Sequence, residues 1–312
     1  MQTNRLKGCL YGYAIGDALG LGTEFMSRPE VAVRYPDGLT TYDRIIQDAH
    51  RSQWNRGEYT NDTFLFLLMA ESITDRGRCD HLDFCVRLKK WFDETAPMDI
   101  TTNLRWVLSA PGYEEHPHQT ARMVFEQHHS VISRNDSLGR AVMLGIWPNF
   151  NEETILDNIL LTHSHPITIA CSIIIAKMAN DLLWHDCETD IETIYALAEK
   201  YAKGVVPFID IARDGTLEEL ELDDEESFDS SAKALSAALW TLWHHENPAD
   251  GLYNIISQGG DANSIGALCG ALLGLKHGFD ALPSHLIEGI RGSVNVENAA
   301  DRLVPVILAA AK

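Results

Sequence analysis

The sequence predicts an all-α protein built as one compact domain over residues 1–312. Apolar residues recur three and four positions apart through most of the chain, which is the spacing of one helix face. Proline and glycine fall in the gaps, and the alternation typical of strands is scarce. The length leans towards two domains, but no segment has the composition of a linker, so we expect a single domain.

The helical pattern recurs along the chain in segments bounded by proline or glycine. The stretch from Glu30 to Asn55 lacks it and is interpreted as rich in loops, with the position of a lid. The predicted helices cover residues 5–20, 63–76, 80–94, 99–108, 118–128, 137–146, 152–160, 166–183, 188–203, 229–245, 249–257, 264–277, 284–290 and 299–310.

Two rows of glycine are spaced four residues apart, one in the first predicted helix and one in the 264–277 helix. Glycine inside a helix costs roughly 1 kcal/mol relative to alanine, so each row needs a compensating gain. A face without Cβ atoms lets a neighbouring helix approach closely, so we expect both helices to be central. Contact between the two would bring Asp17 and Glu24 near Asp261. The rows are Gly8, Gly12, Gly16 and Gly20, and Gly266, Gly270, Gly274 and Gly278.

Composition narrows the class of protein. The net charge of −20 disfavours non-specific nucleic-acid binding, because such binding requires lysine and arginine to neutralise phosphates. A small anionic ligand stays compatible with it, since helix N-termini or a bound cation supply local positive potential. The six cysteines include no close C-x-x-C pair and are interpreted as reduced thiols. We expect a soluble, cytoplasmic protein without a membrane partner, because neither a signal region nor a membrane-spanning apolar run is evident.

Two short polar clusters, each directly before a long apolar run, are the candidate functional features. The first cluster is residues 60–62 (Thr-Asn-Asp), and the second is residues 261–264 (Asp-Ala-Asn-Ser), which follows two glycines. Either can be a helix start whose side chains cap unpaired N–H groups. The second cluster has three side-chain oxygens in four residues, more than capping needs. Such oxygens are donors that Mg²⁺, Mn²⁺ or Ca²⁺ prefer, so a shared metal site is the alternative interpretation.

Five blocks, in order along nearly the whole chain, resemble motifs of the ADP-ribosylglycohydrolases, the family that includes the dinitrogenase-reductase-activating enzyme. Residues 16–24 resemble G-D-A-x-G…E, residues 60–63 resemble T-D-D-T, and residues 259–264 resemble G-G-D-x-D-[TS]. Residues 133–140 resemble the ligand loop G-N-G-x-x-M-R, and residues 161–166 resemble a histidine segment before a helix. Each block alone is a weak signal, and the five together are specific.

The resemblance implies a compact all-helical orthogonal bundle with a binuclear Mg²⁺ or Mn²⁺ centre. It implies hydrolysis of the bond between the ribose C1″ of ADP-ribose and an acceptor, with ADP-ribose or an ADP-ribosylated acceptor as the partner. The implied metal ligands are Thr60, Asn61, Asp62, Asp261, Asn263 and Ser264. The implied pocket residues, with the loop's N–H groups meeting the diphosphate, are Asp17, Asn135, Ser137, Gly139 and His163.

The chemistry that the resemblance implies needs a held ribose and an activated water. The transition state has oxocarbenium character, so oxygen ligands and charges must hold the sugar. Divalent metals orient ribose hydroxyls and lower the pKa of a bound water. We expect Glu24, as base or metal ligand, or Asp62 to accept the proton, and Asp62 and Asp261 to anchor the charge. Arg140 suits an ion pair as well as a ligand contact.

The sequence departs from the family pattern at Asn61 and Asn263, where the family has aspartate. An amide oxygen still binds a hard cation but brings no charge, so we expect weaker metal binding, with one ion in place of two or none without substrate. Three functions stay open: an active hydrolase, a catalytically silent relative that binds ADP-ribose or an ADP-ribosylated partner, and a hydrolase of another N-riboside. Trp54 is a candidate for stacking on a ligand ring. The acceptor is not specified by the sequence.

Overall fold

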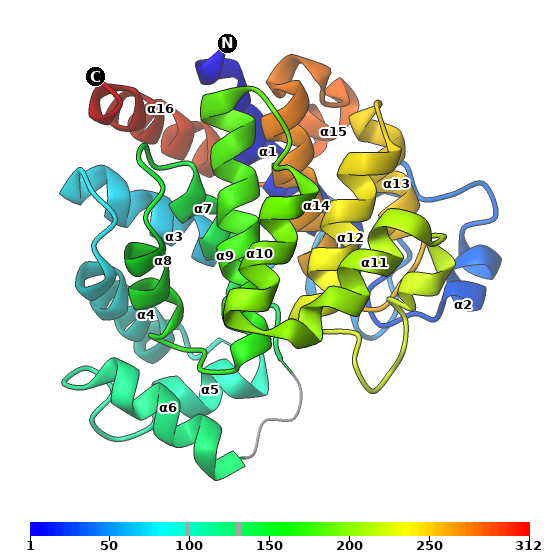
Figure 1. Cartoon of the computed structure of the whole chain (residues 1–312). Helices are drawn as coiled ribbons and strands as arrows, with labels where there is room; N and C mark the ends of the chain where they lie inside the picture. The colour runs from blue at the N-terminus through cyan, green and yellow to red at the C-terminus, as the bar shows by residue number, and fades with distance from the viewer. Residues whose placement is uncertain (98–99, 129–132) are drawn as a thin grey trace.

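The computed structural model describes residues 1–97, 100–128 and 133–312, and these residues form a helical protein (Figure 1). In the described part of the chain there are sixteen α-helices and two isolated β-bridges, and no strand, so the all-α prediction is confirmed. The helices are α1 (Gln2–Gly20), α2 (Arg28–Arg34), α3 (Asn61–Arg76), α4 (His81–Thr95), α5 (Thr102–Ser109), α6 (Pro117–His128), α7 (Leu138–Gly145), α8 (Glu152–Ile159), α9 (Pro166–Asn180), α10 (Ile191–Tyr201), α11 (Val206–Asp214), α12 (Ser231–His244), α13 (Pro248–Ile256), α14 (Ala262–His277), α15 (Ser284–Gly289) and α16 (Ser293–Ala310).

The helix boundaries differ from the prediction in a few places. Helices α2 and α11 were not predicted. Helix α2 is short and begins with a capping box at Ser27. Helix α11 has Pro207 in its first turn, and a proline there resembles a break in the helical pattern. The stretch 30–55 therefore contains the end of a helix as well as loops. Helix α16 begins at Ser293, ahead of the predicted 299. The first residue of the predicted helix 99–108 lies outside the described residues, and α5 begins at Thr102.

Helices α1 and α14 pack antiparallel through their glycine rows, so the two central helices contact each other, which the spacing had left as a hypothesis. A Cβ atom built on Gly12 would lie 2.1 Å from the carbonyl oxygen of Gly270, and one on Gly16 would lie 1.9 Å from that of Gly266. The two backbones therefore touch, which only glycine permits. In Figure 1 the pair lies in the interior, behind α9 and α10. Because both helices are buried along most of their length, they fix the position of everything at their ends.

The core is one continuous cluster of buried apolar side chains drawn from α1, α3, α7, α9, α12 and α14 among others. Helix α9 continues into a π-helical turn (Asp181–His185), and together they have the length and mean hydropathy (1.5) of a membrane-crossing helix. Of that window 78% is buried inside the protein, which is the environment of a core helix. All six cysteine side chains are free.

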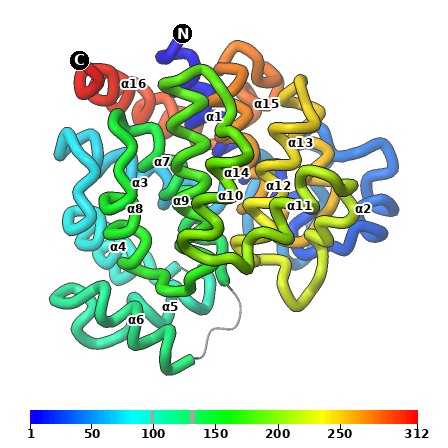
Figure 2. The backbone as a smooth tube through the Cα atoms, in the orientation of Figure 1, coloured from blue at the N-terminus to red at the C-terminus, as the bar shows by residue number. Residues whose placement is uncertain are grey.

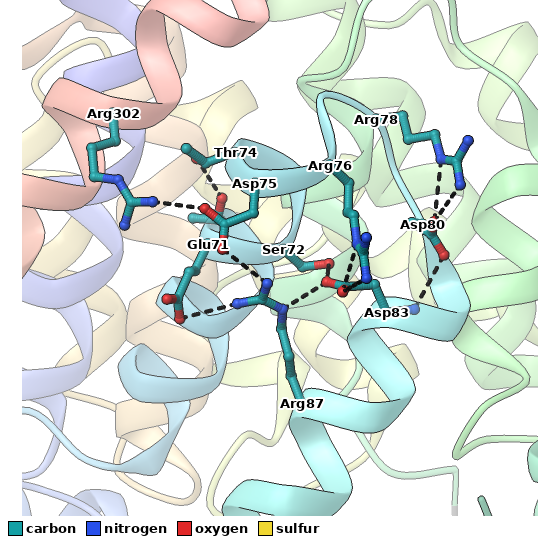
Figure 3. Close-up of polar contacts among 11 residues, drawn as sticks. Glu71, Ser72, Thr74, Asp75, Arg76, Arg78, Asp80, Asp83, Arg87 and Arg302 are labelled. Carbon is teal, nitrogen blue, oxygen red and sulfur yellow. Dashed lines mark hydrogen bonds and ion pairs between the residues drawn. The ribbon is translucent and has the colours of Figure 1, made fainter.

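A network of ion pairs joins α3, α4 and α16 on one side of the molecule (Figure 3). The Arg87 guanidinium lies 2.6 Å from Asp83 and 2.9 Å from Asp75, and Asp75 also pairs with Arg302. Burial opposes ionisation of Asp83, but hydrogen bonds from Ser72 and the arginines hold its pKa below the ordinary value. The carboxylate is therefore charged across the neutral range and links the helices electrostatically.

Replacing Arg87 with alanine is expected to lower the free energy of unfolding by about 1 kcal/mol at neutral pH, because three carboxylates lose a shared partner. The pKa of Asp83 is depressed, so its contribution is present above the unfolded pKa of about 4 and is lost as the pH falls below it. Urea unfolding of both proteins at neutral and acid pH measures this difference. Lys90→Ala, which removes an exposed pair with Glu94, is the control and should change little. An equal loss at acid pH would contradict the electrostatic origin.

Candidate active site

The two polar clusters meet in space, although about two hundred residues separate them. The Ser264 hydroxyl donates a hydrogen bond of 2.8 Å to Oδ2 of Asp62, and the Asn263 amide donates one of 3.3 Å to the same oxygen. The Asn263 amide also lies 3.5 Å from the Thr60 hydroxyl. The start of α3 and the start of α14 are thus two sides of one polar centre.

Local structure explains why the clusters differ in their capping. Thr60 is the N-cap of α3, and its hydroxyl accepts a hydrogen bond of 3.2 Å from the Asp62 N–H. Asp261 occupies the N-cap position of α14 but makes no side-chain cap hydrogen bond. Its Oδ2 instead accepts a bond of 2.7 Å from the Asn135 amide. Capping therefore accounts for Thr60 and not for Asp261.

Two glycines ahead of α14 make the turn possible. Gly259 and Gly260 both have positive φ, at 74° and 66°, which disfavours any residue with a side chain. A Cβ on Gly260 would also lie 1.9 Å from the carbonyl oxygen of Leu222. The backbone of Gly260 pairs with the segment that follows α1. Its carbonyl accepts a hydrogen bond of 2.7 Å from the Phe25 N–H, and its N–H donates one of 2.9 Å to the Met26 carbonyl. This pairing holds the end of the α1 segment against the second cluster.

Asp17 lies behind the first cluster and fixes its backbone. One oxygen, Oδ2, accepts hydrogen bonds from the N–H groups of Thr60 and Thr63, both at 3.0 Å, and from the Thr63 hydroxyl at 2.7 Å. Burial raises the pKa of Asp17 to about 6, and these hydrogen bonds partly oppose the rise. The side chain is fully buried and does not line the cavity described next, so its position is that of a support for α3.

A cavity of about 310 Å³ opens in front of the two clusters. Its size is at the lower end of the range for small-molecule sites. All six predicted metal ligands and Glu24 line it, so the fold brings together the residues that the clusters singled out. The described lining residues are Glu24, Phe25, Thr60, Asn61, Asp62, Leu65, Ile100, Thr101, Thr102, Leu104, Arg134, Asp136, Phe228, Asp229, Asp261, Asn263 and Ser264.

Glu24 is held at the rim by the segment between α2 and α3, which Figure 2 shows running along one edge of the molecule. Its Oε2 lies 2.6 Å from Nε2 of His50, and its backbone carbonyl accepts a hydrogen bond from Arg51. The next residue, Phe25, has φ of 59°, an unfavourable conformation for a residue with a side chain. Its half-exposed ring packs against Phe228, with ring centroids 5.5 Å apart. Contacts with His50 and Arg51 therefore fix the position of Glu24.

The remaining predicted pocket residues lie mainly behind the cavity wall. Asn135 contacts Asp261, as described above, and lines a small adjoining cavity of about 10 Å³ with Gly139. Ser137 is fully buried and lies 3.4 Å from the Ser172 hydroxyl. His163 does not line the cavity; its Nε2 lies 2.6 Å from Asp136, which does. These four predicted residues are therefore not among the described lining of the larger cavity: Asn135 and Gly139 line the small one, and Ser137 and His163 lie behind the wall.

Two further predictions concern side chains outside the cavity. The guanidinium of Arg140 is buried and donates hydrogen bonds to the Asn158 carbonyl, at 3.0 Å, and to the Thr162 hydroxyl. Both partners are uncharged, so the position is a structural one but not the ion pair that was one of the two predicted roles. Trp54 packs edge-on against His50, with ring centroids 5.4 Å apart, and is not among the lining residues. It supports the segment that holds Glu24.

The sequence interpretation did not single out several wall residues. Asp136 accepts a hydrogen bond of 2.6 Å from Thr101 and pairs with His163, and Arg134 forms an ion pair with Asp229. Arg134 and Asp136 flank Asn135 inside the block that resembles a ligand loop, so the sequence offered a reason to consider them as site residues. The sequence offered no such reason for Asp229, because only the folded chain places it beside residues 134 and 135.

The oxygen atoms of the two clusters are donors of the kind that a divalent cation requires. Carboxylate, amide and hydroxyl oxygens are hard donors that suit Mg²⁺ or Mn²⁺. Oδ1 of Asn263 is buried without a hydrogen-bond partner, and a buried acceptor of this kind is satisfied by a cation. Among the described residues no three acidic, histidine or cysteine side chains are grouped as a metal site, since amides replace two carboxylates. The residues present fit one weakly held cation better than two.

Comparisons with known proteins show the fold and the family of this chain. A solved structure described as an "ADP-ribosylglycohydrolase-related protein complex" superposes with a TM-score of 0.71 at 21% identity, covering 98% of both chains. The fold is therefore that of an ADP-ribosylglycohydrolase-related helical protein. The family model for ADP-ribosylglycohydrolase matches residues 1–311, and this chain belongs to that family. The resemblance noted in the sequence is confirmed.

Two of three similar proteins carry named activities. The ADP-ribosyl-[dinitrogen reductase] glycohydrolase of Rhodospirillum rubrum is 25% identical, over 99% of this chain and 97% of its own. The ADP-ribosylarginine hydrolase Tri1 of Serratia proteamaculans (strain 568) is 24% identical, over 96% of this chain and 79% of its own. An uncharacterized protein of Archaeoglobus fulgidus is 26% identical over 96% of this chain. The family is thus one of hydrolases that act on ADP-ribosylated substrates.

Proposed function

We propose that this protein hydrolyses the glycosidic bond at the ribose C1″ of an ADP-ribosylated acceptor, with one divalent cation bound between the two clusters. The observation that carries the proposal is the shared hydrogen bonding of Ser264 and Asn263 to Asp62, which joins two remote helix starts into one oxygen-rich centre. Membership of the ADP-ribosylglycohydrolase family supports the reaction class.

The proposed cation site uses side chains from both helix starts. Asp62 and Asp261 provide the negative charge, and neutral oxygens complete the set. A bound Mg²⁺ or Mn²⁺ would orient ribose hydroxyls and acidify water. The neutral oxygen donors are Thr60, Asn61, Asn263 and Ser264.

Glu24 is proposed to accept the proton of the attacking water, because its side chain lines the same cavity and is held by His50. A carboxylate at this position accepts a proton from an attacking water when both lie within hydrogen-bonding reach. The ribose acquires positive charge as its bond to the acceptor breaks, and the surrounding carboxylates stabilise that charge. Phe25 and Phe228 give the cavity an apolar rim on which the acceptor or a ring of the substrate can pack.

A second candidate function is favoured by one observation. The Asn263 amide donates to Asp62, so part of the centre is satisfied by protein groups alone and does not depend on a metal. A protein of this kind would bind ADP-ribose or an ADP-ribosylated partner without cleaving it. Calorimetric titration with Mg²⁺ or Mn²⁺, with and without ADP-ribose, distinguishes the two. Metal-dependent hydrolysis of an ADP-ribosylated protein substrate supports the first function, and ligand binding without turnover supports the second.

Restoring both carboxylates in the variant Asn61→Asp/Asn263→Asp is expected to tighten Mg²⁺ binding by about tenfold or more, because affinity follows the charge of the ligands. Without metal the variant should be less stable than the natural protein, since a carboxylate at position 263 would lie against Asp62. Thermal unfolding with and without Mg²⁺ measures both effects. Asn298→Asp, at an exposed position of α16 outside the cavity lining, is the control for the added charge. If Mg²⁺ does not raise the unfolding temperature of the variant, the proposed cation site is contradicted.

A further inference from the structure

The aromatic ring of Phe25 is exposed at the cavity, next to the proposed proton acceptor. Phe25 and Glu24 both line the cavity, and the side chain of Phe25 stays 56% exposed. Burial therefore does not explain why an aromatic residue is placed there. The ring packs against those of Phe228 and His50, with centroids 5.5 Å and 5.0 Å away. These are ordinary distances for aromatic pairs, so the two neighbours hold the ring while much of it stays open to solvent.

The backbone of Phe25 is strained. Its φ of 59° lies in the left-handed region, which glycine adopts without steric cost and a residue with a Cβ atom does not. Its N–H donates a hydrogen bond of 2.7 Å to the carbonyl oxygen of Gly260, in the turn that precedes the second cluster. Strained residues persist where surrounding contacts hold them, and they are concentrated at ligand sites. Strain and exposure together indicate that this ring serves a ligand and not the stability of the fold.

The position of Phe25 along the chain indicates which half of the substrate it meets. A trans peptide bond joins it to Glu24, so the two Cα atoms are about 3.8 Å apart. Glu24 is the proposed acceptor of a proton from the water that attacks C1″. The acceptor group of the substrate is bonded to C1″ directly, whereas a ribose, a diphosphate and a second ribose separate C1″ from the adenine. An acceptor carried by a protein must also project towards solvent, and the ring of Phe25 is open on that side.

We propose that Phe25, supported by Phe228, is a specificity-determining residue that contacts the acceptor of an ADP-ribosylated substrate and not its adenosine half. The inference rests on the proposed function and deepens it, because it assigns the aromatic rim of the cavity to the leaving group. The face of an aromatic ring packs on apolar and planar groups, among them the guanidinium of an arginine acceptor. Free ADP-ribose has no acceptor, so it does not make this contact.

The test compares an ADP-ribosylated arginine peptide, which carries an acceptor, with free ADP-ribose, which does not. Steady-state hydrolysis with Mg²⁺ gives the KM of the peptide, and inhibition by added ADP-ribose gives its inhibition constant. If the natural protein binds the peptide without cleaving it, calorimetric titration of both ligands gives the same comparison.

Phe25→Ala is expected to bind the peptide about tenfold more weakly and ADP-ribose with less than about a twofold change, because only the peptide loses an aromatic contact. Phe25→Tyr keeps the ring and should bind both ligands as the natural protein does. Leu82→Ala is the control, because Leu82 is 58% exposed on α4 outside the cavity lining. It removes an exposed apolar side chain and should change neither affinity.

The ratio of the two affinities distinguishes an acceptor contact from a structural role, because a misplaced Glu24 would lower kcat without changing that ratio. Equal weakening of both ligands assigns the ring to the adenosine half, and unchanged affinities assign it to neither; each result overturns the inference. If the natural protein cleaves the peptide and Phe25→Ala keeps the ratio, the proposed function stands and the inference alone falls. A changed ratio in a protein that binds the peptide without cleaving it supports the inference and contradicts hydrolysis. If the natural protein does not bind the peptide, both fall.

Discussion

Replacing Gly270 with alanine is expected to lower the free energy of unfolding by about 3 kcal/mol, which is a large effect for one methyl group. The added Cβ would lie 2.1 Å from the carbonyl oxygen of Gly12, and that atom belongs to the backbone of a buried helix that cannot rotate away. The intrinsic preference of alanine for helices, about 1 kcal/mol, offsets only part of the cost. Urea unfolding followed by circular dichroism measures the loss.

Gly204→Ala is the matched control for this experiment. Gly204 is exposed, and its added Cβ would lie 3.4 Å from a side-chain carbon of Ile167, an ordinary contact. The substitution should leave stability nearly unchanged. If Gly270→Ala and Gly204→Ala cost the same, the close approach of α1 and α14 is not what the glycine rows provide.

Replacing Asp62 with asparagine is expected to reduce hydrolysis of an ADP-ribosylated substrate by about a hundredfold or more. Asp62 accepts hydrogen bonds from both Ser264 and Asn263, so it lies where the two helix starts meet. Removing its charge leaves Asp261 as the remaining carboxylate of the proposed cation site. Initial rates at several Mg²⁺ concentrations would show whether the loss is partly recovered at high metal.

Folding and charge need separate controls for Asp62→Asn. Thermal unfolding should show a folded variant, because asparagine keeps the size and one acceptor oxygen. Asp93→Asn, at an exposed position of α4 paired with Lys89, removes the same charge far along the chain from both clusters and should keep full activity. Activity of Asp62→Asn within a few fold of the natural protein would remove Asp62 from the proposed mechanism.

Sequence patterns predicted the parts of the fold that depend on long, regular segments. The period of apolar residues predicted α3, α4 and α9 in place, and the glycine spacing predicted that α1 and α14 are central and suggested the contact between them. Helices α2 and α11 were missed, and each has proline in its first turn, where proline resembles a break in the helical pattern. Length alone does not explain the difference, because the six-residue α15 was predicted.

The candidate site was predicted where a helix start carries the side chains. The two clusters were recognised because excess oxygen at a helix start is visible in the sequence, and the structure places them at one cavity. Asp136 and Asp229 were not recognised, because both lie on loops whose positions depend on contacts in the folded chain. The two loops pair through an isolated antiparallel β-bridge between Arg134 and Ser230, next to the start of α12. Likewise, nothing local distinguishes Asp17 as a support of α3 from a wall residue.

The antiparallel contact of α1 and α14 has a consequence for the order of events during synthesis. Gly16 and Gly266 are 250 positions apart, so the first helix leaves the ribosome long before its partner exists. Four glycines make that helix intrinsically weak, and its apolar sides stay uncovered meanwhile. The central contact can therefore form only after α14 has been translated, so chaperones that shield the unfinished chain are valuable during this interval.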